Sequence, residues 1–192
     1  VAVRAKLGKA SVTECLRRAK NLPRADWGKM FAHIGFGLMI FGISAIMAWE
    51  FEDIRTAEIG ETFPLQTYEV RFDAVEGIQG PNYTAARGEF TLLKDGAEIA
   101  KLYPEKRNYP VQAMPTTEAA IDQTLLRDVY VVLGDRQNDG SWAVRSYVKP
   151  FTNWIWIGVF TLSFGGVLSI TDRRYRVASA ARKATISAIP AE

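Results

Sequence analysis

Two uncharged apolar blocks stand out along this chain of 192 residues. Residues 30–49 and residues 151–171 contain no Asp, Glu, Lys or Arg, and aromatic residues lie at their ends, among them Trp49, Trp154 and Trp156. An α-helix of about 20 residues crosses a hydrocarbon core of about 30 Å, and tryptophan is enriched where such helices leave the core. The pattern therefore predicts two transmembrane helices, over residues 30–49 and 151–171.

The segment between the blocks, residues 50–150, follows a different pattern. "YEVRFDAVEGI" alternates apolar and polar positions, as a half-buried strand does, and "DVYVVLGD" and "WAVRSYVKP" are further strand-like runs. Asp95-Gly96 and the stretch 138–140 each separate two such runs, and Asp-Gly favours a tight hairpin because both residues tolerate positive φ. The predicted fold class is a membrane protein with two transmembrane α-helices flanking a small antiparallel β-rich domain, built as a sandwich or barrel.

Prolines interrupt this alternation at residues 104–126. That stretch carries three of the eight prolines in the chain, and a proline cannot donate a backbone hydrogen bond within a sheet. We therefore expect an irregular loop there, followed by one helical turn that starts near Thr116.

Charge predicts the orientation. Residues 1–29 hold eight Lys and Arg against two acidic residues, and residues 172–192 hold five against two. Residues 50–150 hold eleven against seventeen. Short flanks rich in Lys and Arg stay in the cytoplasm. We therefore expect a cytoplasmic basic segment at 1–29, a cytoplasmic tail at 172–192, and an exported domain at 50–150.

His33 is the only histidine of the chain, and it lies inside the first apolar block. An ionisable side chain in a membrane span usually faces a cavity, a ligand or a bundle interior. Met30, Gly37 and Ile40 share its helical face, and Gly35 and Gly37 are expected to leave room for a flat group. Imidazole is a common axial ligand of haem iron. The alternative is a neutral histidine that hydrogen-bonds across a helix pair.

Geometry makes a haem site in this chain incomplete. The two axial ligands of a haem lie on opposite faces of the porphyrin, so Met30 and His33, one turn apart on one helix, cannot both bind the iron. No second histidine exists in the chain. If His33 binds haem, the second ligand comes from outside this chain.

Other chemistry is sparse. The sequence shows no phosphate-binding loop, dinucleotide fingerprint, catalytic triad or zinc-ligand spacing, and the exported domain has neither His nor Cys, since Cys15 is the sole cysteine. No catalytic residue can be assigned, and no nucleic-acid partner is expected because basic residues form no exported patch.

Two smaller features remain candidates. Lys106 and Arg107 are cations that could clamp carboxylates such as haem propionates, against the alternative of a solvated loop. Gly165 and Gly166 in the second block favour close contact between the two helices, because small residues let helix backbones approach; the alternative is that they only lower the bulk of the span.

Several long stretches resemble one known family. "LPRADWGKMFAHIGFG", "GPNYTAARGEF", "PEKRNYPVQAMPTTEAAID", "LRDVYVVLGD", "DGSWAVRSYVKPFTNWIWIG" and "DRRYR" are similar, in the same order, to the C-terminal part of the CcmF family. The resemblance runs from about Leu22 to Arg176. CcmF proteins are the membrane haem lyases of bacterial-type cytochrome c maturation.

The resemblance implies a function. In the family, haem passes from the haem chaperone CcmE to the Cys-x-x-Cys-His motif of an apocytochrome c that CcmH and CcmI present, and thioether bonds form. The family also holds a b-type haem through two transmembrane histidines. His33 matches one of them, which implies that His33 is an axial ligand to that haem iron.

The resemblance also implies an incomplete protein. The tryptophan-rich haem-handling segment and the partner histidine lie upstream in the family and have no match here, so this segment alone is expected to be inactive. Both a C-terminal fragment and one subunit of a split protein fit. The expected location is the bacterial inner membrane, with both termini cytoplasmic and residues 50–150 periplasmic. The alternative from another class is a membrane-anchored structural or receptor domain with no haem role.

Overall fold

The computed structural model describes residues 13, 17, 22–111 and 114–172. The predictions for the basic segment 1–29 and the tail 172–192 therefore fall mostly outside the described residues. Contacts along the chain define two units, Val1–Met39 with Ile157–Glu192, and Ile40–Trp156. Each unit is described by itself.

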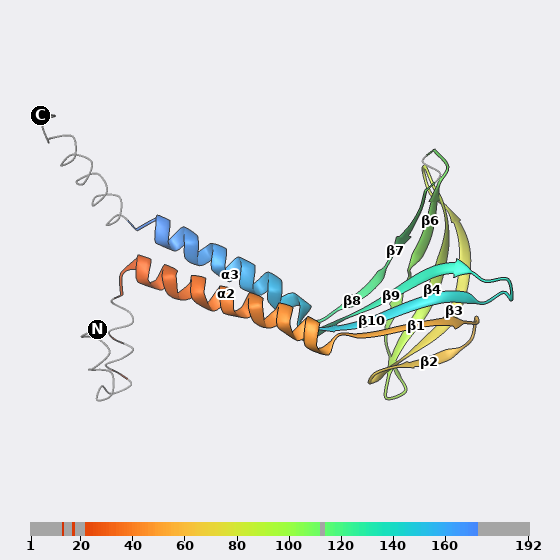
Figure 1. The fold of residues 1–192 in the computed structure, drawn as a ribbon, viewed down its shortest axis with the longest axis horizontal. Coiled ribbons are helices and arrows are strands. Elements are labelled where there is room, and N and C mark those ends of the chain that lie inside the picture. The colour runs from red at the N-terminus through yellow and green to blue at the C-terminus, as the bar shows by residue number, and fades with distance from the viewer. Residues whose placement is uncertain (1–12, 14–16, 18–21, 112–113, 173–192) are drawn as a thin grey trace, which may run out of the picture. The chain divides into compact units, whose positions relative to one another are not determined.

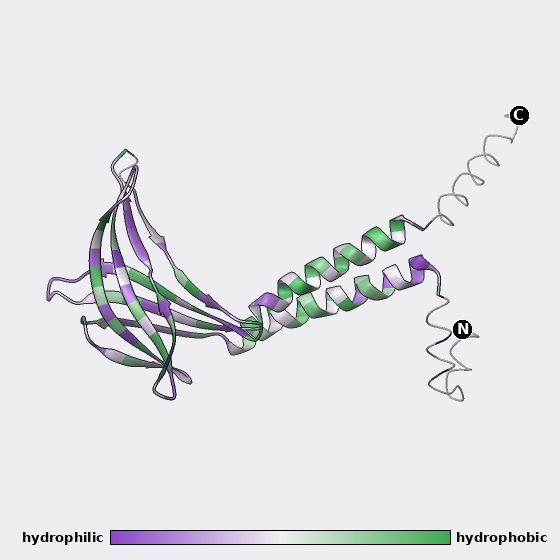
Figure 2. Cartoon of the chain, turned by 180° about the vertical axis from the view of Figure 1, so that it is seen from behind, coloured by the Kyte–Doolittle hydropathy of each residue, from purple (hydrophilic) through white to green (hydrophobic). Residues whose placement is uncertain are grey.

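Two helices are long and apolar enough to cross a membrane. They are α2, Arg24–Trp49, and α3, Thr152–Ile170 (Figure 1). Apolar colouring prevails along both (Figure 2). Helix α2 starts directly after Pro23, whose carbonyl accepts hydrogen bonds from the backbone N–H groups of Asp26 and Trp27. The acidic Asp26 in the first turn suits the positive end of the helix dipole.

Within the unit that contains residues 22–39 and 157–172, glycines bring α2 and α3 into backbone contact. A Cβ atom added to Gly35 would lie 2.6 Å from the carbonyl oxygen of Gly158, and one added to Gly165 would lie 2.5 Å from the amide nitrogen of Ala32. Close contact at Gly165 is confirmed. The expectation for Gly166 is wrong, because a Cβ there would meet nothing within 4 Å among the described residues.

The second unit contains an antiparallel β-sandwich (Figure 1). Its smaller sheet has the order β1-β10-β9-β8, with β1 Phe51–Ala57, β10 Trp142–Pro150, β9 Arg127–Arg136 and β8 Ala120–Gln123. Its larger sheet has the order β2-β3-β4-β6-β7, with β2 Thr62–Leu65, β3 Tyr68–Gln79, β4 Thr84–Lys94, β6 Glu105–Tyr109 and β7 Met114–Glu118, and β5 Ala97–Leu102 also pairs with β4. The predicted fold class is confirmed.

The core of the sandwich comes from alternate residues of both sheets, as a period of two requires. Val129, Val131 and Leu133 of β9 are fully buried, and so are Phe72 and Phe90 on the other sheet. The rings of Phe72 and Phe90 stack with centroids 4.4 Å apart. The hairpin predicted at Asp95-Gly96 is confirmed, because both residues have positive φ between β4 and β5.

The expectation for residues 104–126 is wrong. Three strands, β6, β7 and β8, run through this segment, and Thr116 lies in β7 rather than in a helical turn. Strand β7 comes last in its sheet, and its Pro115 is opposite Asn108 of β6. An edge strand tolerates proline because one side of it needs no donor.

Candidate functional site

His33 is exposed on α2, away from the face that packs on α3. It precedes Gly35 by two residues, which places it about 160° around the helix from that glycine at about 100° per residue. Gly35 is buried against the backbone of α3. The expectation that Gly35 makes room beside His33 is therefore wrong, because Gly35 serves the helix contact instead.

The face that carries His33 is open. Met30 is 39% exposed and Ile40 is 45% exposed. A Cβ atom added to Gly37, one turn after His33, would meet nothing within 4 Å among the described residues. A flat macrocycle thus has space beside the imidazole at Gly37, which fits the predicted ligand role of this face.

A backbone hydrogen bond fixes the chemistry of the imidazole. The Nδ1 atom of His33 lies 2.7 Å from the carbonyl oxygen of Lys29. Because a carbonyl oxygen only accepts, Nδ1 carries the hydrogen, and in the neutral ring the lone pair resides on Nε2. Metal-binding histidines are commonly oriented in this way, with one ring nitrogen donating to a carbonyl and the other left for the metal.

His33 does not belong to a cluster of metal-binding side chains within the part of the chain that the structure describes. Groups of three or more His, Cys, Asp or Glu side chains placed to hold a metal ion do not occur among residues 22–111 and 114–172. Within the described residues, the hydrogen bond of the His33 side chain stays in its own helix. The alternative of a histidine that bonds across to α3 finds no support there.

Lys106 and Arg107 do not form a joint clamp. They are consecutive in β6, so their side chains leave opposite faces of the strand. The Lys106 Nζ atom lies 2.8 Å from Oδ1 of Asp135. The Arg107 Nε atom donates to Oε2 of Glu105 at 2.8 Å, and its guanidinium stacks 4.6 Å from the ring centre of Tyr83. The hypothesis of a shared carboxylate clamp is therefore wrong.

Glu105 instead organises a charged cluster within the sandwich. It is buried and accepts hydrogen bonds from Arg87 and Arg107. Burial alone raises the pKa of Glu105, but the two guanidinium groups outweigh that effect and hold the pKa below its usual value. The hydrogen bond to Glu105 in turn raises the pKa of Arg107. Such a cluster stabilises the fold and supplies no free nucleophile or base.

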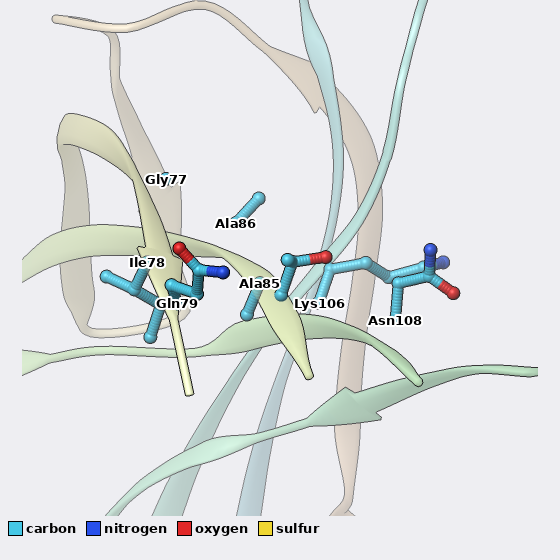
Figure 3. A pocket seen from close by; sticks show the side chains of 8 residues that line it. Gly77, Ile78, Gln79, Ala85, Ala86, Lys106 and Asn108 are labelled. Atoms are coloured by element: carbon cyan, nitrogen blue, oxygen red, sulfur yellow. The ribbon is translucent and has the colours of Figure 1, made fainter. Parts of the chain in front are cut away.

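A shallow hollow of about 400 Å³ lies over β3, β4 and β6. Figure 3 shows Lys106 and Asn108 on one side of it and Ile78 and Gln79 on the other. Its one charged side chain, Lys106, is paired with Asp135. The hollow offers amide and hydroxyl groups without a titratable pair, so no reaction is assigned to it.

Comparisons with known proteins agree with these features. A family model described as the CcmF C-terminal beta-sandwich matches residues 48–150. The cytochrome c-type biogenesis protein ccl1 of Rhodobacter capsulatus is 53% identical over 176 residues, which cover 91% of this chain and 27% of the relative. The cytochrome c-type biogenesis protein CcmF of Pseudomonas aeruginosa is 44% identical over 163 residues, which cover 84% of this chain and 25% of the relative.

A solved structure shares the fold. The structure of a cytochrome c heme lyase CcmF superimposes with a TM-score of 0.63 at 16% identity, over 77% of this chain and 25% of that one. The chain thus spans about a quarter of the length of these relatives. With the β-sandwich match covering more than half of its residues, the chain belongs to the CcmF family and corresponds to its C-terminal part.

Proposed function

We propose that this chain is the C-terminal part of a cytochrome c haem lyase and that His33 is one axial ligand of a b-type haem. The observation that carries the proposal is the state of the imidazole. Nδ1 is held by the Lys29 carbonyl, which leaves the Nε2 lone pair on the open face of α2. Relatives that cover the same region are named for cytochrome c biogenesis.

Each residue around His33 has a defined task in this proposal. The carbonyl of Lys29 holds the tautomer, and Gly37 leaves space for the edge of the macrocycle. Gly35 and Gly158 lock α2 against α3, so the imidazole is presented from a fixed helix. When bound, the b-type haem would provide a one-electron redox centre able to keep the iron of the transferred haem reduced. The second axial ligand comes from the upstream segment.

The remaining parts of the proposal concern partners and location. The full lyase transfers haem from CcmE to the Cys-x-x-Cys-His motif of an apocytochrome c, with CcmH and CcmI presenting that substrate. The β-sandwich, which lacks His and Cys, docks partners rather than making bonds, so this segment alone is inactive. The β-sandwich lies in the periplasm, and both termini lie on the cytoplasmic side of the inner membrane, as the distribution of Lys and Arg favours.

The test is spectroscopic. The chain is purified with the upstream lyase segment, and the absorbance of the b-type haem is recorded for the parent, for His33→Ala and for Met30→Leu. His33→Ala should lose the spectrum of the two-ligand haem, because one of its axial ligands is gone. Met30→Leu lies on the same exposed face and should retain it. An unchanged spectrum in His33→Ala would remove the site assignment.

A structural role without haem is the second candidate. In that case His33→Ala would leave the absorbance spectrum of the complex unchanged. The topology is tested separately with a reporter enzyme fused after Glu192, which should be active in the cytoplasm. Periplasmic activity of that fusion would overturn the orientation without affecting the ligand assignment.

A further inference from the structure

The turn between β8 and β9 has an unusual composition. Its residues Thr124, Leu125 and Leu126 connect Gln123 to Arg127. Exposed turns favour Gly, Pro, Asn, Asp and Ser, because these residues suit turn geometry or bond to the turn backbone. Here the two apical positions are leucines, and each is 60% exposed.

The backbone carbonyls of this turn are all bonded within the protein. Asn153 Nδ2 donates to the carbonyl of Thr124 at 2.7 Å, and Trp154 Nε1 donates to the carbonyl of Leu125 at 3.0 Å. The backbone N–H of Phe151 donates to the carbonyl of Leu126 at 2.8 Å. The three donors come from the residues that open α3.

This combination fits a segment that has left water. The carbonyls of a turn in water need no protein partners, because water donates hydrogen bonds to them. In hydrocarbon no water is present, so every carbonyl of a turn must be bonded within the protein. Exposed leucines are costly in water and favourable in lipid. Bonded carbonyls beneath exposed leucines therefore match the apolar side of a membrane interface.

The position of the turn supports the same occupant. Its bonds place it level with the first turn of α3, which begins at Thr152 in an apolar helix able to cross a membrane. Charged pairs lie directly next to this level, because Arg127, the residue after the turn, pairs with Asp122, and Lys149 Nζ lies 3.1 Å from Oε1 of Glu50. Figure 1 shows β8 and β9 reaching the start of α3. Trp154 and Trp156 at the same level suit an interfacial belt.

The stem of the turn holds it rigid. The Thr124 hydroxyl donates to the carbonyl of Arg127 at 2.7 Å. The Arg127 guanidinium pairs with Asp122 and with the hydroxyl of Tyr68. The opposite end of β9 is the contrast, because its turn, 137–141, consists of Gln, Asn, Asp, Gly and Ser.

We propose that the β8–β9 turn inserts Leu125 and Leu126 into the acyl-chain boundary of the lipid leaflet on the side of the β-sandwich. The partner is the bilayer itself. The turn thereby fixes the sandwich at the membrane surface through a third contact, in addition to the two helices. This inference rests on the turn and on α3, and it does not depend on haem binding by His33.

Depth measurements test the proposal. In a Cys15→Ser background, single cysteines are introduced as Leu125→Cys and Leu126→Cys and labelled with an environment-sensitive fluorophore. The chain, together with the upstream lyase segment, is placed in nanodiscs of phosphatidylethanolamine and phosphatidylglycerol. Lipids brominated near the glycerol end of their acyl chains quench from the membrane, and iodide quenches from water.

Three matched positions calibrate the result. Asn138→Cys reports the polar turn at the other end of β9, and Val111→Cys reports an apolar residue that is 95% exposed in the β6–β7 connection. Trp156→Cys reports an exposed position on α3 and serves as the lipid reference. Labels at 125 and 126 should resemble the label at 156, with iodide quenching several-fold weaker than at 138, because a charged quencher stays out of the acyl boundary.

Two outcomes would overturn the proposal. Iodide quenching at 125 and 126 equal to that at 111 and 138 would place the turn in water. Protection of both labels from iodide and from brominated lipid would show that a protein segment covers the turn instead. The two labelled positions are independent, so loss of folding in one variant leaves the other as the test.

Discussion

The β-sandwich and the helix pair treat their large side chains in opposite ways. In the sandwich, Phe63, Phe72 and Phe90 are fully buried. Along the two helices, Phe36 is 51% exposed and Phe160 is 70% exposed. Within the most apolar stretch of each helix, 17% of α2 and 11% of α3 is buried inside the protein. The sandwich is packed by its own residues, whereas the helices need an apolar surrounding.

Different interactions stabilise the sandwich and the helix pair. Burial of apolar area in water stabilises the sandwich. Between helices in lipid this driving force is absent, and close packing of small residues and hydrogen bonds replaces it. The glycines of α2 and α3 fit that rule. The face that bears His33 belongs to the helix pair, where large apolar side chains are exposed.

The largest effect should come from the core of the sandwich. Phe72→Ala removes one ring of the stacked Phe72–Phe90 pair and leaves a cavity, so it should lower the free energy of unfolding by about 3–5 kcal/mol. Urea unfolding followed by the β-sheet circular dichroism signal measures it. Phe160→Ala, at an exposed site of α3, should leave the free energy of unfolding of the sandwich nearly unchanged. Equal effects of the two variants would show that the exposed ring on α3 contributes as much to stability as the buried ring in the sandwich.

The helix contact should respond to added bulk at one face only. Gly35→Leu places its Cβ 2.6 Å from the Gly158 carbonyl oxygen. Overpacking costs about 1–3 kcal/mol when side chains can adjust, and here backbone must move. Gly37→Leu, two residues along the helix and on its open face, is the control and should be tolerated.

The distance between the helices reports this directly. Spin labels at the exposed positions Ile34 and Val167, in a Cys15→Ser background, allow the separation to be measured by electron-electron resonance. Gly35→Leu should lengthen it by about 2 Å, since helix separations depend on the side chains at the contact. A Gly35→Leu variant with the parent distance would show that the glycine contact is not required.

Local patterns in the sequence were sufficient for the elements whose causes are local. The uncharged blocks predict α2 and α3, and Asp95-Gly96 predicts its hairpin, because hydropathy and turn geometry act over a few residues. The lone histidine in a span identifies the candidate ligand. The hydrogen bond from His33 to Lys29 spans one helical turn, so it is also a local feature.

Features that depend on residues far apart in the chain could not be predicted from local sequence patterns. Strand β6 forms because it pairs with β4, about twenty residues earlier along the chain, so the flanking Pro104 and Pro110 led to the wrong prediction. The role of Gly35 depends on Gly158 of the other helix. The leucines of the β8–β9 turn are meaningful only beside Asn153 and Trp154, which no local pattern connects to them.

A smaller effect is expected where the helices are joined by a cap. Oδ2 of Asp172, just after α3, accepts a hydrogen bond from the backbone N–H of Ala25 at the start of α2 at 3.0 Å. Removing a carboxylate that caps a helix costs about 0.5–2 kcal/mol. Asp172→Ala should therefore lower the thermal midpoint of the helix pair in detergent, while Asp172→Asn, which keeps an acceptor, should lose less. Equal losses would assign the effect to charge rather than to the cap.

The smallest effect should appear as a pH dependence of the sandwich alone. Hydrogen bonds from Arg87 and Arg107 hold the pKa of Glu105 below its unfolded value of 4.5. A depressed folded-state pKa stabilises the protein above the unfolded pKa, and that contribution is lost as the pH falls through the folded value. Glu105→Gln should therefore flatten the loss of stability below about pH 4.5, by about 1 kcal/mol or less because its partners Arg87 and Arg107 are partly exposed to solvent.

Urea midpoints measured from neutral pH down to the acid limit would show this flattening. Glu76→Gln, at an exposed position of β3, is the matched control and should leave the profile of the parent unchanged. The helix pair contains no such buried carboxylate cluster within its apolar stretches, because residues 30–49 and 151–171 carry no acid. Glu105→Gln and the parent could instead lose stability in parallel below pH 4.5. The hydrogen bonds from Arg87 and Arg107 to Glu105 would then contribute nothing, and the sandwich would owe its stability to its apolar core alone.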